Sequence, residues 1–234
     1  MWEWLLSPVD ASRAHDVGWA VSWHARAMVM GWGVLAPSAV LIARFFKVMP
    51  GQKWPEQLDN KVWWRSHWMG QSVVFMLTLL GLALVWPPSW QDLDLHRILG
   101  YCVLLGLLFQ TLLGIARGSK GGPTETTPDG SLRGDHYDMT PRRIVFERVH
   151  KTFGYLLLIL AAATIVVGLW DVNGPRWMWL ALAFWWVFYA CTFAALQRRG
   201  MAVDTYQAIW GADPAHPGNQ QAVSNWWQHT TRRR

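Results

Sequence analysis

Five apolar stretches, each near or above the length needed to cross a lipid bilayer, constrain this chain more than any other feature. A membrane-spanning helix needs about 18 or more apolar residues. Only 15% of the 234 residues are charged, whereas soluble domains are closer to a quarter charged. The sequence therefore predicts an all-α integral membrane bundle of five transmembrane helices. Their expected bounds are about 18–47, 62–86, 95–116, 149–170 and 177–196.

The remaining residues form polar segments rather than a second folded domain. Residues 1–17 precede the first helix, and Pro87-Pro88-Ser89 ends the second. Turn residues in the loop 117–147 indicate irregular structure, and we expect the tail, 197–234, to be partly disordered.

Lysine and arginine are distributed unevenly between the two sides that the alternating helices define. One side carries four of them, and the other carries the remaining seventeen of the 21. Positive charge is retained in the cytoplasm, so residues 1–17 should be periplasmic and the tail cytoplasmic. This asymmetry explains the net charge of +6, and nucleic acid is not an expected partner.

Four histidines, His24, His67, His96 and His150, lie within about one turn of the start of four successive apolar stretches. The chain reverses direction at each crossing, so the first and third helices start on one side and the second and fourth on the other. We therefore expect His24 to pair with His96, and His67 with His150, at two depths. Histidine inside a membrane is costly and usually functional.

Two imidazole nitrogens complete the coordination of a haem iron and suit electron transfer. The four histidines are therefore predicted to be the metal ligands of two haem b groups, with irons roughly 20 Å apart along the membrane normal. A single histidine at a helix start is more often an interfacial polar residue, but four in register favour haem. Zinc is a weaker alternative, because structural zinc sites gather four ligands in one place.

Glycines near the histidines are candidates for the haem pockets, because a flat macrocycle between helices needs such notches. Close helix packing explains them equally well. These glycines are Gly31, Gly70, Gly100 and Gly154. On the side of His24 and His96, Arg26 and Arg97 could pair with haem propionates or reach the lipid headgroups.

Basic residues also flank the other two histidines, and a cationic rim would attract an anionic reductant or stabilise the anion formed from a quinone. Membrane anchoring is the simpler interpretation. The candidate substrate residues are Lys61, Arg65, Arg148 and Lys151.

The histidines in polar segments are expected to be solvent-exposed, although the loop around His136 could instead cap a haem. These histidines are His15, His136, His216 and His229.

Several motifs, in order, resemble the cytochrome b561 family, notably its bacterial and DOMON-linked branch. They are the helix from His24 to Lys47, His67, His96-Arg-Ile-Leu-Gly100 with Gln110, and His150-Lys-Thr-Phe-Gly154. The resemblance covers about residues 23–170 and implies two b haems. In eukaryotic members, basic residues at positions like those of Lys61 and Arg65 resemble part of an ascorbate site. The familiar animal and plant members have six helices, whereas no spanning helix is expected here before the one with His24, and no DOMON domain is attached.

The residues and the resemblance together predict a cytochrome of a bacterial inner membrane that carries single electrons from a cytoplasmic-side or quinol donor to a periplasmic acceptor. Its reaction would be of the ascorbate-, quinol- or ferric-reductase type. Expected partners are membrane lipid, a quinone or ascorbate-like reductant and a periplasmic redox protein. The alternatives are a haem-containing subunit of a larger respiratory or photosynthetic complex, and a non-redox membrane scaffold.

Overall fold

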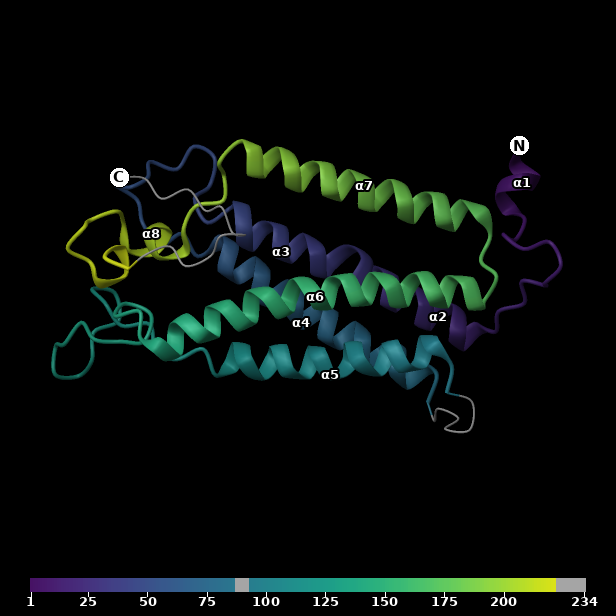
Figure 1. Ribbon diagram of the computed structural model, residues 1–234, viewed down its shortest axis with the longest axis horizontal. Helices are drawn as coiled ribbons and strands as arrows, with labels where there is room; N and C mark the ends of the chain where they lie inside the picture. Colours follow the sequence, from purple (N-terminus) through teal and green to yellow (C-terminus); the bar gives the residue numbers. More distant parts are fainter. Residues whose placement is uncertain (87–92, 222–234) are drawn as a thin grey trace. The chain divides into compact units, whose positions relative to one another are not determined.

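The computed structural model describes residues 1–86 and 93–221. Within these ranges the regular structure is helical and no strand occurs (Figure 1). Five helices there are long and apolar enough to cross a membrane, so the predicted all-α fold is confirmed. The break expected at Pro87-Pro88-Ser89, and the end of the tail with His229, lie outside the described residues.

The first membrane span consists of three consecutive segments, and the other four spans are single helices. In order, the spans are α2 (Trp19–Met28) with the π-helix η1 (Val29–Leu35) and α3 (Ala36–Phe45), then α4 (Val62–Leu84), α5 (Leu95–Ile115), α6 (Pro141–Asp171) and α7 (Arg176–Arg198). The shorter elements are α1 (Trp2–Leu6), α8 (Thr205–Trp210) and the 3-10 helix η2 (Pro217–Asn219).

Helix α6 begins at Pro141 rather than at about residue 149, so the preceding loop is shorter than the sequence predicts. Proline is favoured at the first position of a helix, where its missing N–H is not needed. The Thr140 hydroxyl accepts a hydrogen bond from the Arg143 backbone N–H at 3.3 Å, which caps the helix. The sequence predicts the start of this helix from the start of its apolar run, and the polar first turns lie before that run.

The π-helical segment of the first span directly precedes Pro37. Proline has no N–H, so it cannot donate to the carbonyl of Gly33 four residues earlier. That carbonyl instead accepts a hydrogen bond from the indole Nε1 of Trp185, in α7, at 3.0 Å. A neighbouring helix therefore satisfies the backbone group that the proline leaves open, as membrane helices require.

The chain forms two compact units, and each of the five membrane spans contributes to both. Unit 1 comprises residues 1–39, 68–108 and 155–193, and unit 2 comprises residues 40–67, 109–154 and 194 onwards.

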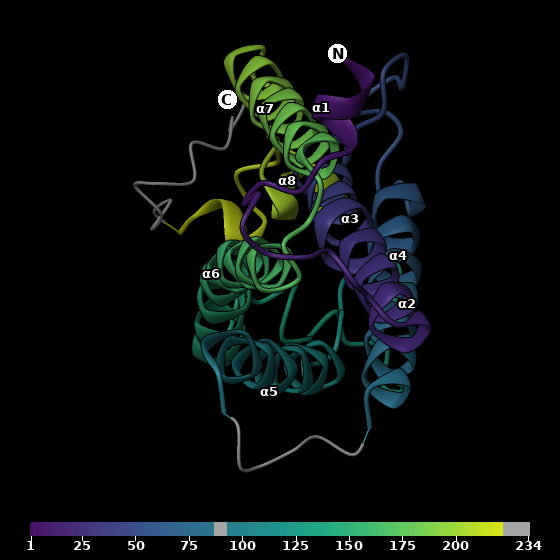
Figure 2. The same cartoon turned by 90° about the vertical axis from the view of Figure 1, so that its right-hand side faces the viewer.

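In unit 1, α2 packs beside α4, and α5 packs beside α6 (Figures 1 and 2). The N-terminal segment is tied to the turn between α6 and α7. Pro8 and Pro175 form an isolated bridge, and the Asn173 side-chain amide donates to the carbonyls of Asp10 and Arg13 at 2.9 and 2.6 Å. Residues 1–17 therefore belong to the folded structure of this unit.

In unit 2, the loop 116–140 folds together with residues 201–221, and we call these two segments the cap. Its core is made by the buried Tyr206, Ile209 and Trp210, against which Tyr137 packs. The Asp204 side chain caps α8 by accepting hydrogen bonds from the backbone N–H groups of Tyr206 and Gln207. The described part of the tail is thus folded, which its polar composition does not predict.

Candidate functional site

The structure brings the four predicted histidines together in two pairs. His24 of α2 and His96 of α5 have ring centroids 6.1 Å apart and planes at 84°. His67 of α4 and His150 of α6 have centroids 6.2 Å apart and planes at 85°. We call these the first pair and the second pair. The first lies within unit 1 and the second within unit 2.

Backbone carbonyls hold both rings of the first pair. His24 donates from Nδ1 to the carbonyl of Gly81 at 2.9 Å, and His96 donates from Nδ1 to the carbonyl of Thr164 at 3.1 Å. A carbonyl oxygen only accepts hydrogen bonds, so in each ring the proton is on Nδ1. Each Nε2 therefore keeps its lone pair for a metal ion.

Two glycines that the sequence analysis does not single out contact these rings. A Cβ on Gly168 would lie 2.6 Å from His96 Cε1, and one on Gly81 would lie 3.5 Å from His24 Nδ1 and 2.4 Å from Met28 Cε. Each glycine is on a different helix from its histidine. Spacing along one helix therefore gives no signal for them.

The surroundings of His150, in the second pair, are different. Phe146, one turn earlier, stacks on its ring with centroids 5.3 Å apart and planes at 14°. The Gln110 side-chain amide of α5 donates from Nε2 to the His150 backbone carbonyl at 3.0 Å. The Nδ1 atom of His150 is buried and has no hydrogen-bond partner, and neither has the buried Oε1 atom of Gln110.

The four predicted glycines have different neighbours. Cβ atoms on Gly31 and Gly70 would lie 3.6 Å from the Leu77 side chain and 2.9 Å from the Ala39 side chain, so both glycines serve the packing of the first span on α4. A Cβ on Gly154 would lie 3.2 Å from Gln110 Nε2, and one on Gly100 would meet no atom within 4 Å. Of the four, Gly100 is therefore the one that suits a pocket.

The two predicted arginines beside the first pair have partners near them in sequence. Arg26 donates to the Ser22 hydroxyl and lies over the Trp23 ring. Arg97 lies 3.5 Å from the carboxylate of Asp94.

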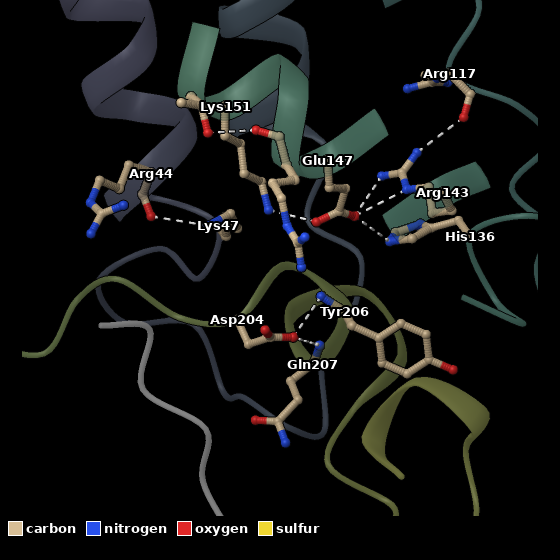
Figure 3. A network of polar contacts seen from close by, with 12 residues as sticks. Arg44, Lys47, Arg117, His136, Arg143, Glu147, Lys151, Asp204, Tyr206 and Gln207 are labelled. Carbon is tan, nitrogen blue, oxygen red and sulfur yellow. Dashed lines mark hydrogen bonds and ion pairs between the residues drawn. The ribbon is translucent and has the colours of Figure 1, made fainter. Parts of the chain in front are cut away.

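In unit 2, a carboxylate surrounded by cations lies one turn before His150 in the sequence (Figure 3). Glu147 accepts hydrogen bonds from Arg143 Nε at 3.0 Å and from Lys151 Nζ at 2.6 Å. The Glu147 side chain is only 14% exposed. Of the predicted substrate residues, Lys151 belongs to this network, Lys61 is exposed 4.0 Å from Asp59, and Arg65 and Arg148 are exposed.

Lys47, which the sequence analysis does not single out, is buried in the same region. Its Nζ donates to the backbone carbonyl of Arg44 at 3.2 Å (Figure 3) and to that of Val203 at 3.0 Å. Burial, and then the positive charge of Lys151, lower the pKa of Lys47 to about 7. Lys47 therefore joins the end of α3 to the cap and titrates near neutral pH.

The prediction that His136 is solvent-exposed is wrong. Its side chain is 4% exposed and lies against the rings of Tyr206 and Trp210, with His136 Nε2 3.8 Å from Glu147 Oε1. Burial, followed by the charge of Arg143, lowers the pKa of His136 to about 3. The ring is therefore neutral at pH 7. That the loop around His136 caps a haem stays a prediction.

The spacing of each pair fits two imidazoles on one metal ion. A metal ion lies about 2 Å from a ligating imidazole nitrogen, and the ring centre lies about 1 Å beyond that nitrogen. Two such rings on opposite sides of one metal have centroids roughly 6 Å apart. Each ring plane contains the metal–nitrogen bond and can turn about it, so the near-perpendicular planes of 84° and 85° are compatible with this arrangement.

Each pair supplies imidazole ligands suited to haem rather than to a bare ion. Within residues 1–86 and 93–221, no three or more His, Cys, Asp and Glu side chains gather around one point. A haem iron needs only two protein ligands, because the porphyrin supplies the other four. The residues present therefore fit a haem at each pair.

Residues 23–125 match the family described as eukaryotic cytochrome b561. This part of the chain is similar to that family. The match covers less than half of the chain and includes His24, His67 and His96, whereas His150 lies beyond it. Neither curated proteins nor solved structures give a match.

Proteins of the cytochrome b561 family bind haem b and transfer electrons in membranes. This general function agrees with the five apolar helices and with the two imidazole pairs. The chain is accordingly a multi-pass membrane protein.

Proposed function

We propose that this chain is a di-haem cytochrome b that carries single electrons across a membrane, with one haem ligated by His24 and His96 and the other by His67 and His150. The observation that supports this most directly is the pair of ring separations, 6.1 and 6.2 Å, with one imidazole pair in each compact unit. A direct edge-to-face contact of two rings falls in the same distance range. Two pairs with this spacing occur, one at each set of helix starts as the sequence predicts, and this favours metal ligation over a chance contact of the rings.

The residues of the chain bind and orient, and bound haem would supply the one-electron iron couple. In the first pair, the carbonyls of Gly81 and Thr164 fix the tautomer, so that Nε2 of each ring is the ligating atom. A hydrogen bond on the other ring nitrogen also raises the basicity of the ligand. The apolar helices around the pairs exclude water, which keeps the ligated form stable.

Two glycines and two arginine side chains complete the proposed haem sites. Gly100 leaves space on the face of α5 that follows His96, and Gly154 leaves space that Gln110 enters. Arg26 and Arg97 would neutralise haem propionates next to the first pair. Gly31 and Gly70 act indirectly, by letting the first span approach α4.

On the side of the second pair, we propose that a cytoplasmic reductant or a quinol delivers electrons. The rim of positive charge is made by Lys61, Arg65, Arg148 and Lys151. Such a rim favours an anionic donor, or the anion left when a neutral donor loses a proton. The acceptor would be periplasmic, in a bacterial inner membrane with the N-terminus outside and the C-terminus inside, as the distribution of lysine and arginine indicates.

The haem content of the purified protein tests this proposal. We expect two haem b per chain, each with the low-spin spectrum of iron ligated by two imidazoles. Replacement of His96 by alanine should remove one haem and leave the other with its spectrum unchanged. A preparation without haem would instead support the non-redox scaffold, and one with a single haem would refute the pairing.

A second candidate function is that of a haem-containing subunit in a larger complex. Helix α7 has no buried residue, and its large side chains Leu180, Phe184 and Val187 are exposed. Lipid covers such a face in a free-standing protein, and another subunit covers it in a complex. Mild detergent extraction from the native membrane would separate the two cases, because only a subunit co-purifies with stoichiometric partners.

A further inference from the structure

His150, in the second pair, lacks the carbonyl contact that orients each ring of the first pair. Both rings of the first pair donate from Nδ1 to backbone carbonyls on neighbouring helices. In His150 the Nδ1 atom is buried and has no partner. A buried polar atom without a partner costs free energy, so an acceptor for this nitrogen is expected nearby.

A suitable acceptor, Gln110 Oε1, is already next to His150. The Gln110 side chain donates from Nε2 to the His150 backbone carbonyl at 3.0 Å, and its own Oε1 is buried without a partner. The Gln110 amide nitrogen therefore already has a partner on His150, and His150 is the residue whose Nδ1 has none. A small rotation about the terminal side-chain bonds of glutamine changes where Oε1 points.

The local packing is arranged around this glutamine. A Cβ at position 154 would lie 3.2 Å from Gln110 Nε2, so Gly154 is the residue that gives the amide room. On either side, Phe109 of α5 and Phe153 of α6 pack edge to face with ring centroids 5.0 Å apart. The two helices are therefore held together at the turn where Gln110 and His150 meet.

We propose that Gln110 is a positioning residue for the haem of the second pair: its Oε1 accepts the hydrogen bond from His150 Nδ1 and so presents Nε2 to the iron. The inference rests on the proposed function, because it assumes that His150 is a haem ligand. A side-chain amide would then do for the second pair what backbone carbonyls do for the first. The effect of such an acceptor is to make the imidazole a stronger donor, which favours ferric iron.

The test is a redox titration of the purified full chain with both haems bound, followed by absorption and electron paramagnetic resonance spectroscopy. In Gln110→Leu the acceptor is lost, so the midpoint potential of the second haem should rise. In Gln110→Glu a stronger acceptor replaces the amide, so that potential should fall. The first haem should not change in either variant. Haem affinity at the second site should fall about 10- to 100-fold in Gln110→Leu.

Gln197→Leu is a matched control, because it removes a glutamine of unit 2 whose side-chain oxygen accepts hydrogen bonds from Arg44. It should leave both haems unchanged. If Gln110→Leu binds no second haem while Gln110→Glu retains it, the proposal also stands. It is overturned if both variants leave the second potential unchanged, shift it in the same direction, or lose both haems.

Failure of the proposed function would give a different result. In that case the unmodified protein would not bind two haems, or His150→Ala would retain the second haem. If the unmodified protein binds two haems and the Gln110 variants leave the second midpoint potential unchanged, only the role of the glutamine is refuted.

Discussion

The two imidazole pairs have nearly equal ring separations and angles but different surroundings. The first is held by main-chain carbonyls of Gly81 and Thr164. The second belongs to the unit that contains Lys47, which is 6% exposed and is the one buried charged residue among residues 1–86 and 93–221. That unit also contains the ion cluster around Glu147. Two haems bound at these pairs would therefore have different midpoint potentials although their ligands are alike, because charge and second-layer hydrogen bonds tune haem iron.

The largest expected effect separates the two pairs by loss of haem. His96→Ala should remove the first haem and His150→Ala the second, each halving the haem content measured by the pyridine haemochrome method. The two single variants should together account for the full spectrum of the unmodified protein. If either substitution removes both haems, the two sites are not independent and the comparison fails.

A smaller effect is expected from crowding the first pair alone. In Gly168→Ala the new Cβ would lie 2.6 Å from His96 Cε1, so the ring has to shift. We expect the first haem to be bound at least tenfold more weakly, measured by haem titration, with the second unaffected. Gly114→Ala is the control, since a Cβ there meets no atom within 4 Å.

The ion cluster of unit 2 should affect the second pair more than the first. Glu147→Gln removes the carboxylate that Arg143 and Lys151 share. The environment becomes more positive, which stabilises the reduced haem, so the second midpoint potential should rise. Asp135→Asn, which removes the ion pair between Asp135 of the cap and Arg142 of α6, should have little effect. Equal shifts of both potentials in Glu147→Gln would contradict this expectation.

The smallest expected effect is a pH dependence of the cap. The pKa of His136 is about 3 in the folded cap and near 6.5 when the cap is open. The open state therefore binds more protons between pH 3 and 6.5, and cap stability falls as pH falls through that window. From pH 7 to pH 5 the loss is about 2 kcal/mol.

Hydrogen exchange of the backbone amides in residues 116–140, corrected for the intrinsic exchange rate, measures this loss. In His136→Phe, the difference between pH 7 and pH 5 should disappear. Equal protection of the cap amides from exchange at pH 7 and pH 5 in the unmodified protein would show that His136 remains neutral in the open state as well.

The helices and the histidine pairing were predictable because they depend on local length and on alternating direction. Apolar runs define the five spans, and the order of the helices brings His24 to His96 and His67 to His150. The start of α6 was set too late because a polar helical turn carries no apolar signal. Pro141 and Thr140 are the residues that mark it.

The acceptors of the ring nitrogens and the burial of His136 could not be predicted, because they depend on residues distant in sequence. Gly81 is 57 residues from His24 along the chain, and Thr164 is 68 residues from His96. The cap depends on aromatic residues of α8 packing against a loop some seventy residues earlier. Each segment alone has the composition of a polar connection.

The carbonyls of Gly81 and Thr164 have a consequence for how such a protein can change over time. A main-chain oxygen is present whatever side chain occupies the position, so point mutations do not easily remove the anchors of His24 and His96. Where a side-chain amide is the acceptor, a single amino-acid substitution can change the hydrogen bond to the ring. One end of the electron path would then be fixed by the fold, and the other would be open to natural variation and to protein engineering.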